Sequence, residues 1–230
     1  MNKKEHIMVT TIICFVTMII LLAHISEISA TDEENRMALI IVSTYEMNSA
    51  EFSKANSFHQ YLLDKGYQEE DIGHLGMSSG YYSDGLSNVS NVENEFNWLI
   101  NNEDPDKDII VYLSDHVPPL SGDEIFRFQD GNISIPQVDT WISDMDFNSS
   151  TVIVGGNHSG IAGPELEDPS REIICSMGSD QSFSPDHFNI TRGLEDTSAD
   201  NNNDGEVSFI EAYWKEVENL QGTGQDPIMY

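Results

Sequence analysis

The chain has 230 residues, a length that suits one α/β domain of ordinary size. It carries 40 acidic residues against 10 basic ones, which gives a formal net charge of −30 at pH 7. Nucleic acids and anionic membrane surfaces are bound through positive patches, so this excess of carboxylates argues against DNA and RNA as partners.

The first 30 residues have the pattern of a signal peptide. Two lysines precede an uncharged apolar run over residues 7–23, and the small residues Ser29 and Ala30 offer a cleavage site. We therefore expect residues 1–30 to direct export and residues 31–230 to form a secreted or cell-surface domain. The apolar run lies close to the lower limit of ~17 residues for a spanning helix, so an uncleaved N-terminal anchor remains the alternative. The sequence predicts no other membrane contact.

Short apolar runs alternate with amphipathic stretches along the exported part. Alternating strands and helices are typical of βαβ crossovers, so the sequence predicts a three-layer α/β/α fold with a mostly parallel central sheet and no second domain. The first half of the domain is expected to form a strand at 37–42, a helix at 49–65, a strand at 71–75, a loop at 77–90, a helix at 92–101 and a turn at 104–106. A strand at 108–113, a helix at 136–145 and strands at 151–156 and 171–176 follow. A weak helix at 188–196 and a helix at 210–217 complete the expected elements.

Two of these strands end in residues that suit catalysis. One ends in Ser114-Asp115-His116, and another ends in the glycine-flanked segment Gly155-Gly156-Asn157-His158-Ser159-Gly160. In an open parallel sheet, ligands bind at the carboxyl ends of the strands. A histidine at one strand end and a small turn at another would form a hydrolase site of the dyad type, with His116 as the general base.

Together, these two segments resemble the motifs of the legumain family of cysteine peptidases, which shares its fold with caspases. That family carries (S/T)-D-H-G after one strand and, about 40 residues later, E/D-A-C-x-S-G after another. The resemblance extends over most of residues 36–230. It implies a caspase-like fold, His116 as the family's general base and position 157 as the place of the nucleophile.

The departures from the family pattern indicate lost activity. Val117 replaces a glycine of the family, and Asn157 stands where the nucleophilic cysteine is expected. An amide is a poor nucleophile, so His116 has no thiol to activate. The sequence therefore predicts a catalytically inactive peptidase homologue that binds a peptide or a protein.

Alternatives to this reading remain open. One is an active peptidase with a non-standard nucleophile, for which Ser159 is a candidate, or one that processes itself at an asparagine. A second is a structural surface protein whose only ligand is calcium. Cys14 lies in the leader, so Cys175 would be the only cysteine of the exported part, and we interpret it as a buried core thiol.

A calcium loop is the other strong motif. Residues 200–211 match the twelve-residue EF-hand pattern D-x-[DN]-x-[DN]-G-x5-E, and a helix is expected directly after it. Val207 would pack inward, and an acidic loop without metal remains the alternative. Because only one such loop is present, we expect a structural calcium clip and not a switch. The expected oxygen ligands are Asp200, Asn202, Asp204, the backbone carbonyl of Glu206, Ser208 and Glu211.

Overall fold

The structure is a computed structural model that describes residues 36–43, 49–76, 82–115, 125–182 and 188–230. The chain divides into two units, Met1–Arg36 and Met37–Tyr230, and the fold described here is that of the second. Within the described residues, no helix is both long and apolar enough to cross a membrane.

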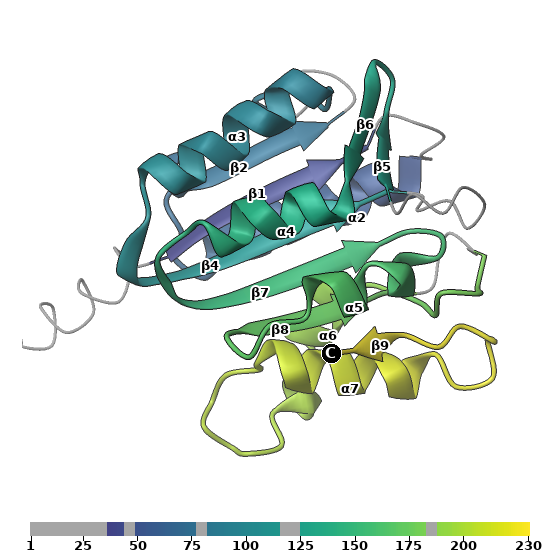
Figure 1. Cartoon of the computed structure of the whole chain (residues 1–230). Helices are drawn as coiled ribbons and strands as arrows, with labels where there is room; N and C mark the ends of the chain where they lie inside the picture. The colour runs from purple at the N-terminus through teal and green to yellow at the C-terminus, as the bar shows by residue number, and fades with distance from the viewer. Residues whose placement is uncertain (1–35, 44–48, 77–81, 116–124, 183–187) are drawn as a thin grey trace, which may run out of the picture. The chain divides into compact units, whose positions relative to one another are not determined.

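A seven-stranded sheet runs through the domain in the order β3-β2-β1-β4-β7-β8-β9 (Figure 1). Within this sheet, the pairs β1–β2, β2–β3, β4–β7 and β7–β8 are parallel, and the pair β8–β9 is antiparallel. Its strands are β1 (Arg36–Val42), β2 (Ile72–Gly76), β3 (Gly85–Leu86), β4 (Asp104–Ser114), β7 (Phe147–Gly155), β8 (Arg171–Cys175) and β9 (Ile228–Met229).

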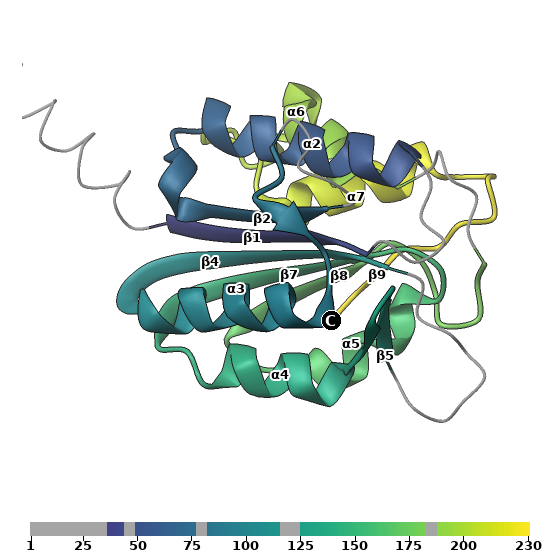
Figure 2. The same ribbon diagram turned by 90° about the horizontal axis from the view of Figure 1, so that it is seen from above.

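Helices cover both faces of this sheet. Figure 2 shows α2, α6 and α7 on one face and α3, α4 and α5 on the other. This arrangement confirms the predicted three-layer α/β/α fold with a mostly parallel sheet. The helices are α2 (Ser49–Asp64), α3 (Val89–Asn101), α4 (Ile135–Ser143), α5 (Gly163–Leu166), α6 (Ile190–Glu195) and α7 (Phe209–Asn219), with short 3-10 turns at Glu69–Asp71, Ser159–Ile161 and Thr197–Ala199.

Each face of the sheet has its own hydrophobic core. Side chains alternate along a strand, so Val152 faces the core under α3 and α4, whereas its neighbour Ile153 faces the core under α2 and α7. The central strands are therefore buried on both faces, which is why they appear in the sequence as continuous apolar runs.

Some elements differ from the expectation. The predicted turn at 104–106 belongs to β4, and α3 begins at Val89, within the predicted loop, because Asn88 caps it by accepting a hydrogen bond from the backbone N–H of Asn91 at 2.8 Å. The sequence also gave no expectation of an antiparallel hairpin, β5 (Ile125–Phe128) and β6 (Gly131–Ser134).

Candidate functional site

The carboxyl ends of β4 and β7 lie side by side. The two strands pair in parallel up to Ser114 and Gly155, and the backbone N–H of Asp115 then donates to the carbonyl of Gly155 at 3.0 Å. Both predicted motif segments therefore begin at the same edge of the sheet. The predicted base His116 and its neighbour Val117 lie outside the described residues.

The turn that carries Asn157 is pressed against the end of β4. Gly156 has a φ of +110°, and a Cβ atom placed on it would lie 1.8 Å from the carbonyl oxygen of Asp115. Only glycine fits this backbone and this close approach. Asn157 itself is half-buried, directly after this glycine.

The far side of the turn is anchored to the segment that follows β8. The backbone N–H of His158 donates to the carbonyl of Gln181 at 3.0 Å, and His158 Nδ1 lies 2.9 Å from the carbonyl of Ser179. His158 also adopts a left-handed backbone, with a φ of 57°. The turn around Asn157 is thus fixed from both sides.

Ser159 is a structural residue in this turn. Its side chain is fully buried, and its Oγ accepts a hydrogen bond from the backbone N–H of Met177 at 3.1 Å and lies 3.2 Å from Ser176 Oγ. A hydroxyl used in this way is not presented to a substrate.

Cys175 is also inaccessible. It has no exposed surface at the end of β8, and burial raises the pKa of its thiol to about 12. The thiolate is therefore negligible at neutral pH, which agrees with the interpretation of Cys175 as a core residue.

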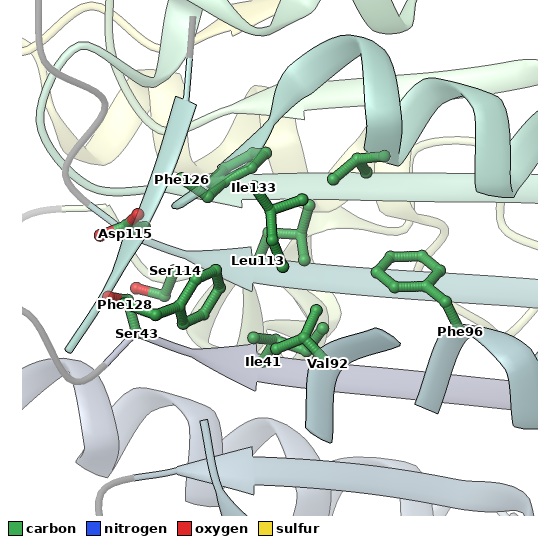
Figure 3. A pocket seen from close by; sticks show the side chains of 11 residues that line it. Ile41, Ser43, Val92, Phe96, Leu113, Ser114, Asp115, Phe126, Phe128 and Ile133 are labelled. Carbon is green, nitrogen blue, oxygen red and sulfur yellow. The ribbon is translucent and has the colours of Figure 1, made fainter. Parts of the chain in front are cut away.

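The β5–β6 hairpin covers the strand ends on one face of the sheet. Figure 3 shows Phe126, Phe128 and Ile133 of the hairpin gathered around Leu113, with Ser114 and Asp115 at the polar end. The cavity between them has a volume of about 10 Å³ and a lining that is almost wholly apolar. Since about one water molecule would fill that space, this cavity is packed core and not a binding pocket.

A carboxylate that the sequence did not single out lies on the other face of the strand ends. Glu51, in the first turn of α2, is only 2% exposed. Ser114 Oγ donates to its Oε2 at 3.0 Å, and Lys54 Nζ lies 3.1 Å from its Oε1. A glutamate in a first helical turn is usually solvated, so the sequence alone did not indicate this burial.

The predicted calcium loop has a compact hydrogen-bonded form. Glu211 Oε1 accepts the backbone N–H groups of Asn201 at 2.9 Å and of Asn202 at 3.2 Å, while its Oε2 accepts that of Ser208 at 3.0 Å. The hydrogen bonds from Ser208 are the largest reason why the pKa of Glu211 lies below its usual value. Gly205 has a φ of +97°, as expected of the glycine at the sharp bend.

Two further observations bear on the fit of a cation to this loop. Asp200 Oδ2 accepts the N–H of Gly205 at 3.1 Å, whereas Asp200 Oδ1 is buried and has no hydrogen-bond partner among the described residues. Val207 packs against the core under α2 and α7, as predicted. Within the described ranges, however, no three His, Cys, Asp or Glu side chains converge as a metal cluster, so a cation here would also need amide, hydroxyl and backbone oxygens.

Comparison with known proteins extends the description of the fold. The structure is similar to the crystal structure of the Drosophila initiator caspase Dronc, with a TM-score of 0.53 over 86% of this chain and 79% of that one. The fold is caspase-like. The two sequences are 9% identical, so the similarity concerns the fold alone. The sequence matches no protein-family model and no curated protein.

Proposed function

We propose that the chain is an exported, catalytically inactive homologue of the legumain-type peptidases that binds a peptide or protein segment at the carboxyl ends of its strands. The observation that carries the proposal is the position of Asn157. It occupies the turn after β7, beside the end of the strand that leads to His116, where the resemblance places a nucleophilic cysteine. An amide at this position offers no thiolate for a general base to activate.

The surroundings of Asn157 support the absence of a substitute nucleophile. Ser159 lies two residues away, but its hydroxyl is buried and bonded to the backbone of Met177. Cys175 is fully buried, and its thiol stays protonated at neutral pH. Neither side chain reaches solvent, so neither favours the alternative of an active peptidase with a non-standard nucleophile.

Binding without cleavage is supported by the position of the site. The strand ends of a parallel sheet are where α/β folds bind ligands, because loops and unpaired backbone groups collect there. The backbone of the Asn157 turn is held by Asp115 on one side and Gln181 on the other. Such a rigid surface can bind an extended peptide with little loss of its own conformational freedom.

The second part of the proposal is a calcium clip at residues 200–211. The buried, unpartnered Asp200 Oδ1 suits a cation, and the ionised Glu211 is close by in the loop. The ion would be held by Asp200, Asn202, Asp204, the Glu206 carbonyl, Ser208 and Glu211. It would neutralise loop carboxylates and fix the start of α7, which begins at Phe209.

Hydrolysis and peptide binding are tested together on a peptide library incubated with the protein from acid to neutral pH. We expect mass spectrometry to find every peptide intact and affinity capture to recover a bound subset. If the wild-type protein cleaves a peptide and His116→Ala does not, the proposed inactivity is contradicted. Failure to retain any peptide would refute the binding function.

The position of Asn157 can be tested through a thiol. We expect Asn157→Cys to become labelled by iodoacetamide in the native state, because residue 157 is half-buried on the site turn. Cys175 is the internal control, since its buried thiol should react only after unfolding. Peptide mapping distinguishes these two positions from Cys14. An introduced thiol that reacts no faster than Cys175 would show that the turn is closed to ligands.

A further inference from the structure

Glu51 is a buried charge with no part in the proposed lost chemistry. It lies in the first turn of α2, where the helix dipole favours a negative charge. Its carboxylate is nevertheless removed from water, since the side chain is 3% exposed. Burial of an ionised carboxylate is unfavourable unless a cation and hydrogen bonds compensate it.

The compensating cation is the side chain of Lys54. Its Nζ lies 3.1 Å from Glu51 Oε1, one helical turn along α2. Lysine carries a compact charge on a flexible four-carbon stem, so its ammonium can move without a change of the backbone, but a buried carboxylate left without a cation is strongly unfavourable. The ammonium can therefore leave Glu51 only in exchange for another cation.

The pair lines a small pocket beside the site turn. Its walls include Tyr112, Gly155, Gly156 and Phe188, so the pocket reaches the two residues that precede Asn157. The cavity has a volume of about 10 Å³, enough for one water molecule but not for a side chain. Space for a ligand group would come mainly from the volume that the Lys54 side chain vacates.

Apart from Lys54, the described residues that line this pocket carry no positive charge. Tyr112 is buried there, and its pKa is raised first by burial and then by the charge of Glu51. The whole chain adds to this effect through its net charge of −30. An incoming cation is therefore attracted both by the pocket and by the surface around it.

We propose that this pocket is a subsite for a cationic side chain, an arginine or lysine of the bound peptide, with Glu51 as its counter-ion and Lys54 as the internal cation that the ligand displaces. The proposal rests on the peptide-binding function proposed above and names its ligand class. The apolar walls, Ile153 and Phe188, suit the methylene stem of such a side chain. A neutral side chain that displaced Lys54 would take this cation away from Glu51 without replacing it, so the pocket should favour a cationic side chain over a neutral one.

Chemical rescue tests the pocket without any peptide. Lys54→Ala removes both the ammonium and the volume of its stem, so its melting temperature should fall. Added n-butylammonium should restore several degrees to Lys54→Ala, whereas n-butanol, a neutral molecule of matched shape, should not. Because Lys54 competes for Glu51 in the wild-type protein, n-butylammonium should stabilise it less than it stabilises Lys54→Ala, and neither compound should stabilise the double variant Glu51→Gln/Lys54→Ala. If Lys54→Ala does not fold, Lys54→Met removes the charge with most of the volume kept, and the peptide experiment is made on it.

Paired peptides test the subsite in the working protein. Peptides recovered from the library are resynthesised with citrulline, a neutral isostere, in place of each arginine. We expect wild-type protein to bind the arginine form at least ~10-fold more tightly, Lys54→Ala to bind it more tightly still, and Glu51→Gln to lose the preference.

The outcomes separate this inference from the binding function itself. Equal affinity for arginine and citrulline peptides would overturn the cation subsite and leave peptide binding intact. Rescue by butylammonium without binding of any peptide would support the cation pocket and reject the peptide-binding function. Absence of both rescue and arginine preference would overturn the inference outright.

Discussion

The carboxylate of Asp115 accepts a hydrogen bond from the backbone N–H of Arg127. The residue next to the predicted base thereby holds the β5–β6 hairpin against the end of β4. Ser43, just beyond β1, holds the same point of the hairpin, because its hydroxyl donates to the carbonyl of Arg127. Asp115, which lies in the segment that resembles the catalytic motif of the legumain family, thus has a structural role in this chain.

We expect Asp115→Ala to destabilise the protein by about 1–3 kcal/mol, because it leaves a backbone N–H of the hairpin without its acceptor. Urea unfolding measures the loss, and hydrogen exchange should locate it in residues 125–134. Asp130→Ala is the matched control. Its carboxylate also accepts a backbone N–H, that of Val89 at 3.1 Å, but the pair is exposed and its loss should cost ~0.5 kcal/mol or less. Equal losses in both variants would contradict the structural role of Asp115.

Gly156 should tolerate no side chain. A left-handed backbone costs a non-glycine residue ~1–2 kcal/mol, and at Gly156 the new Cβ would also collide with Asp115 O. We expect Gly156→Ala to lose about 3 kcal/mol or more in chemical denaturation. Gly224→Ala separates the two effects, since Gly224 has a φ of +81° with nothing within 4 Å of an added Cβ. Similar losses at both positions would show that the close approach to β4 is absent.

A buried histidine pair makes stability depend on pH. His59 Nδ1 and His74 Nδ1 lie 3.1 Å apart, and burial, with a smaller contribution from His59, lowers the pKa of His74 from 6.5 to about 4. The folded state therefore keeps His74 neutral in a pH range where the unfolded chain binds a proton. Unfolding takes up this proton, so stability falls as the pH drops from 6.5 to 4 and levels off below that range.

This effect amounts to about 3 kcal/mol for His74. Urea titrations at several pH values should show that His74→Gln loses less stability on acidification than the wild-type protein by that amount. His158→Gln is the control, because His158 lies half-buried on the site turn, away from the pair, and it should keep the wild-type slope. A wild-type slope in His74→Gln would refute the assignment.

Calcium should stabilise the protein through residues 200–211. At a concentration 100 times its dissociation constant, a ligand adds ~2.7 kcal/mol, which raises the melting temperature of a domain of this size by about 5–10 °C. Chelation should remove this increase, and Glu211→Gln should abolish it. Glu206→Gln should keep it, because position 206 contributes only its backbone carbonyl. Trp214, 55% exposed on α7, provides a fluorescence signal for the same titration. Identical melting curves with calcium and with chelator would exclude the site.

The sequence predicted the elements whose signal is local. The runs that form β1, β4, β7 and β8 are apolar on both faces. Helix α2 ends at Asp64, and Gly66, just beyond it, has the expected positive φ of 91°. The β5–β6 hairpin was missed because its strands are only four residues long. The alternation of Phe126 and Phe128, followed by the polar residues Gln129 and Asp130 that form the two-residue turn, was the available signal.

The motifs located the turn of Asn157 and the calcium loop, but not the contacts that shape them. The need for glycine at position 156 arises from Asp115, which is distant in sequence and adjacent in space. The burial of Glu51 depends in the same way on Ser114, 63 residues further along the chain. Contacts between residues so far apart in the sequence produce no hydrophobic periodicity. Both contacts can therefore be recognised only in the three-dimensional structure.

At least four of the eight lysines and arginines in the described residues are paired with carboxylates. Within the described residues, Lys54 pairs with Glu51, Arg171 with Asp139, Arg192 with Glu216 and Lys215 with Asp196. Few cations are left to offset the surface carboxylates, which repel one another. Dissolved salt screens that repulsion over ~8–10 Å but has less effect on the buried pair of Lys54 and Glu51. We therefore expect rising ionic strength to stabilise the protein, so that it unfolds at a higher temperature in concentrated salt than in dilute solution.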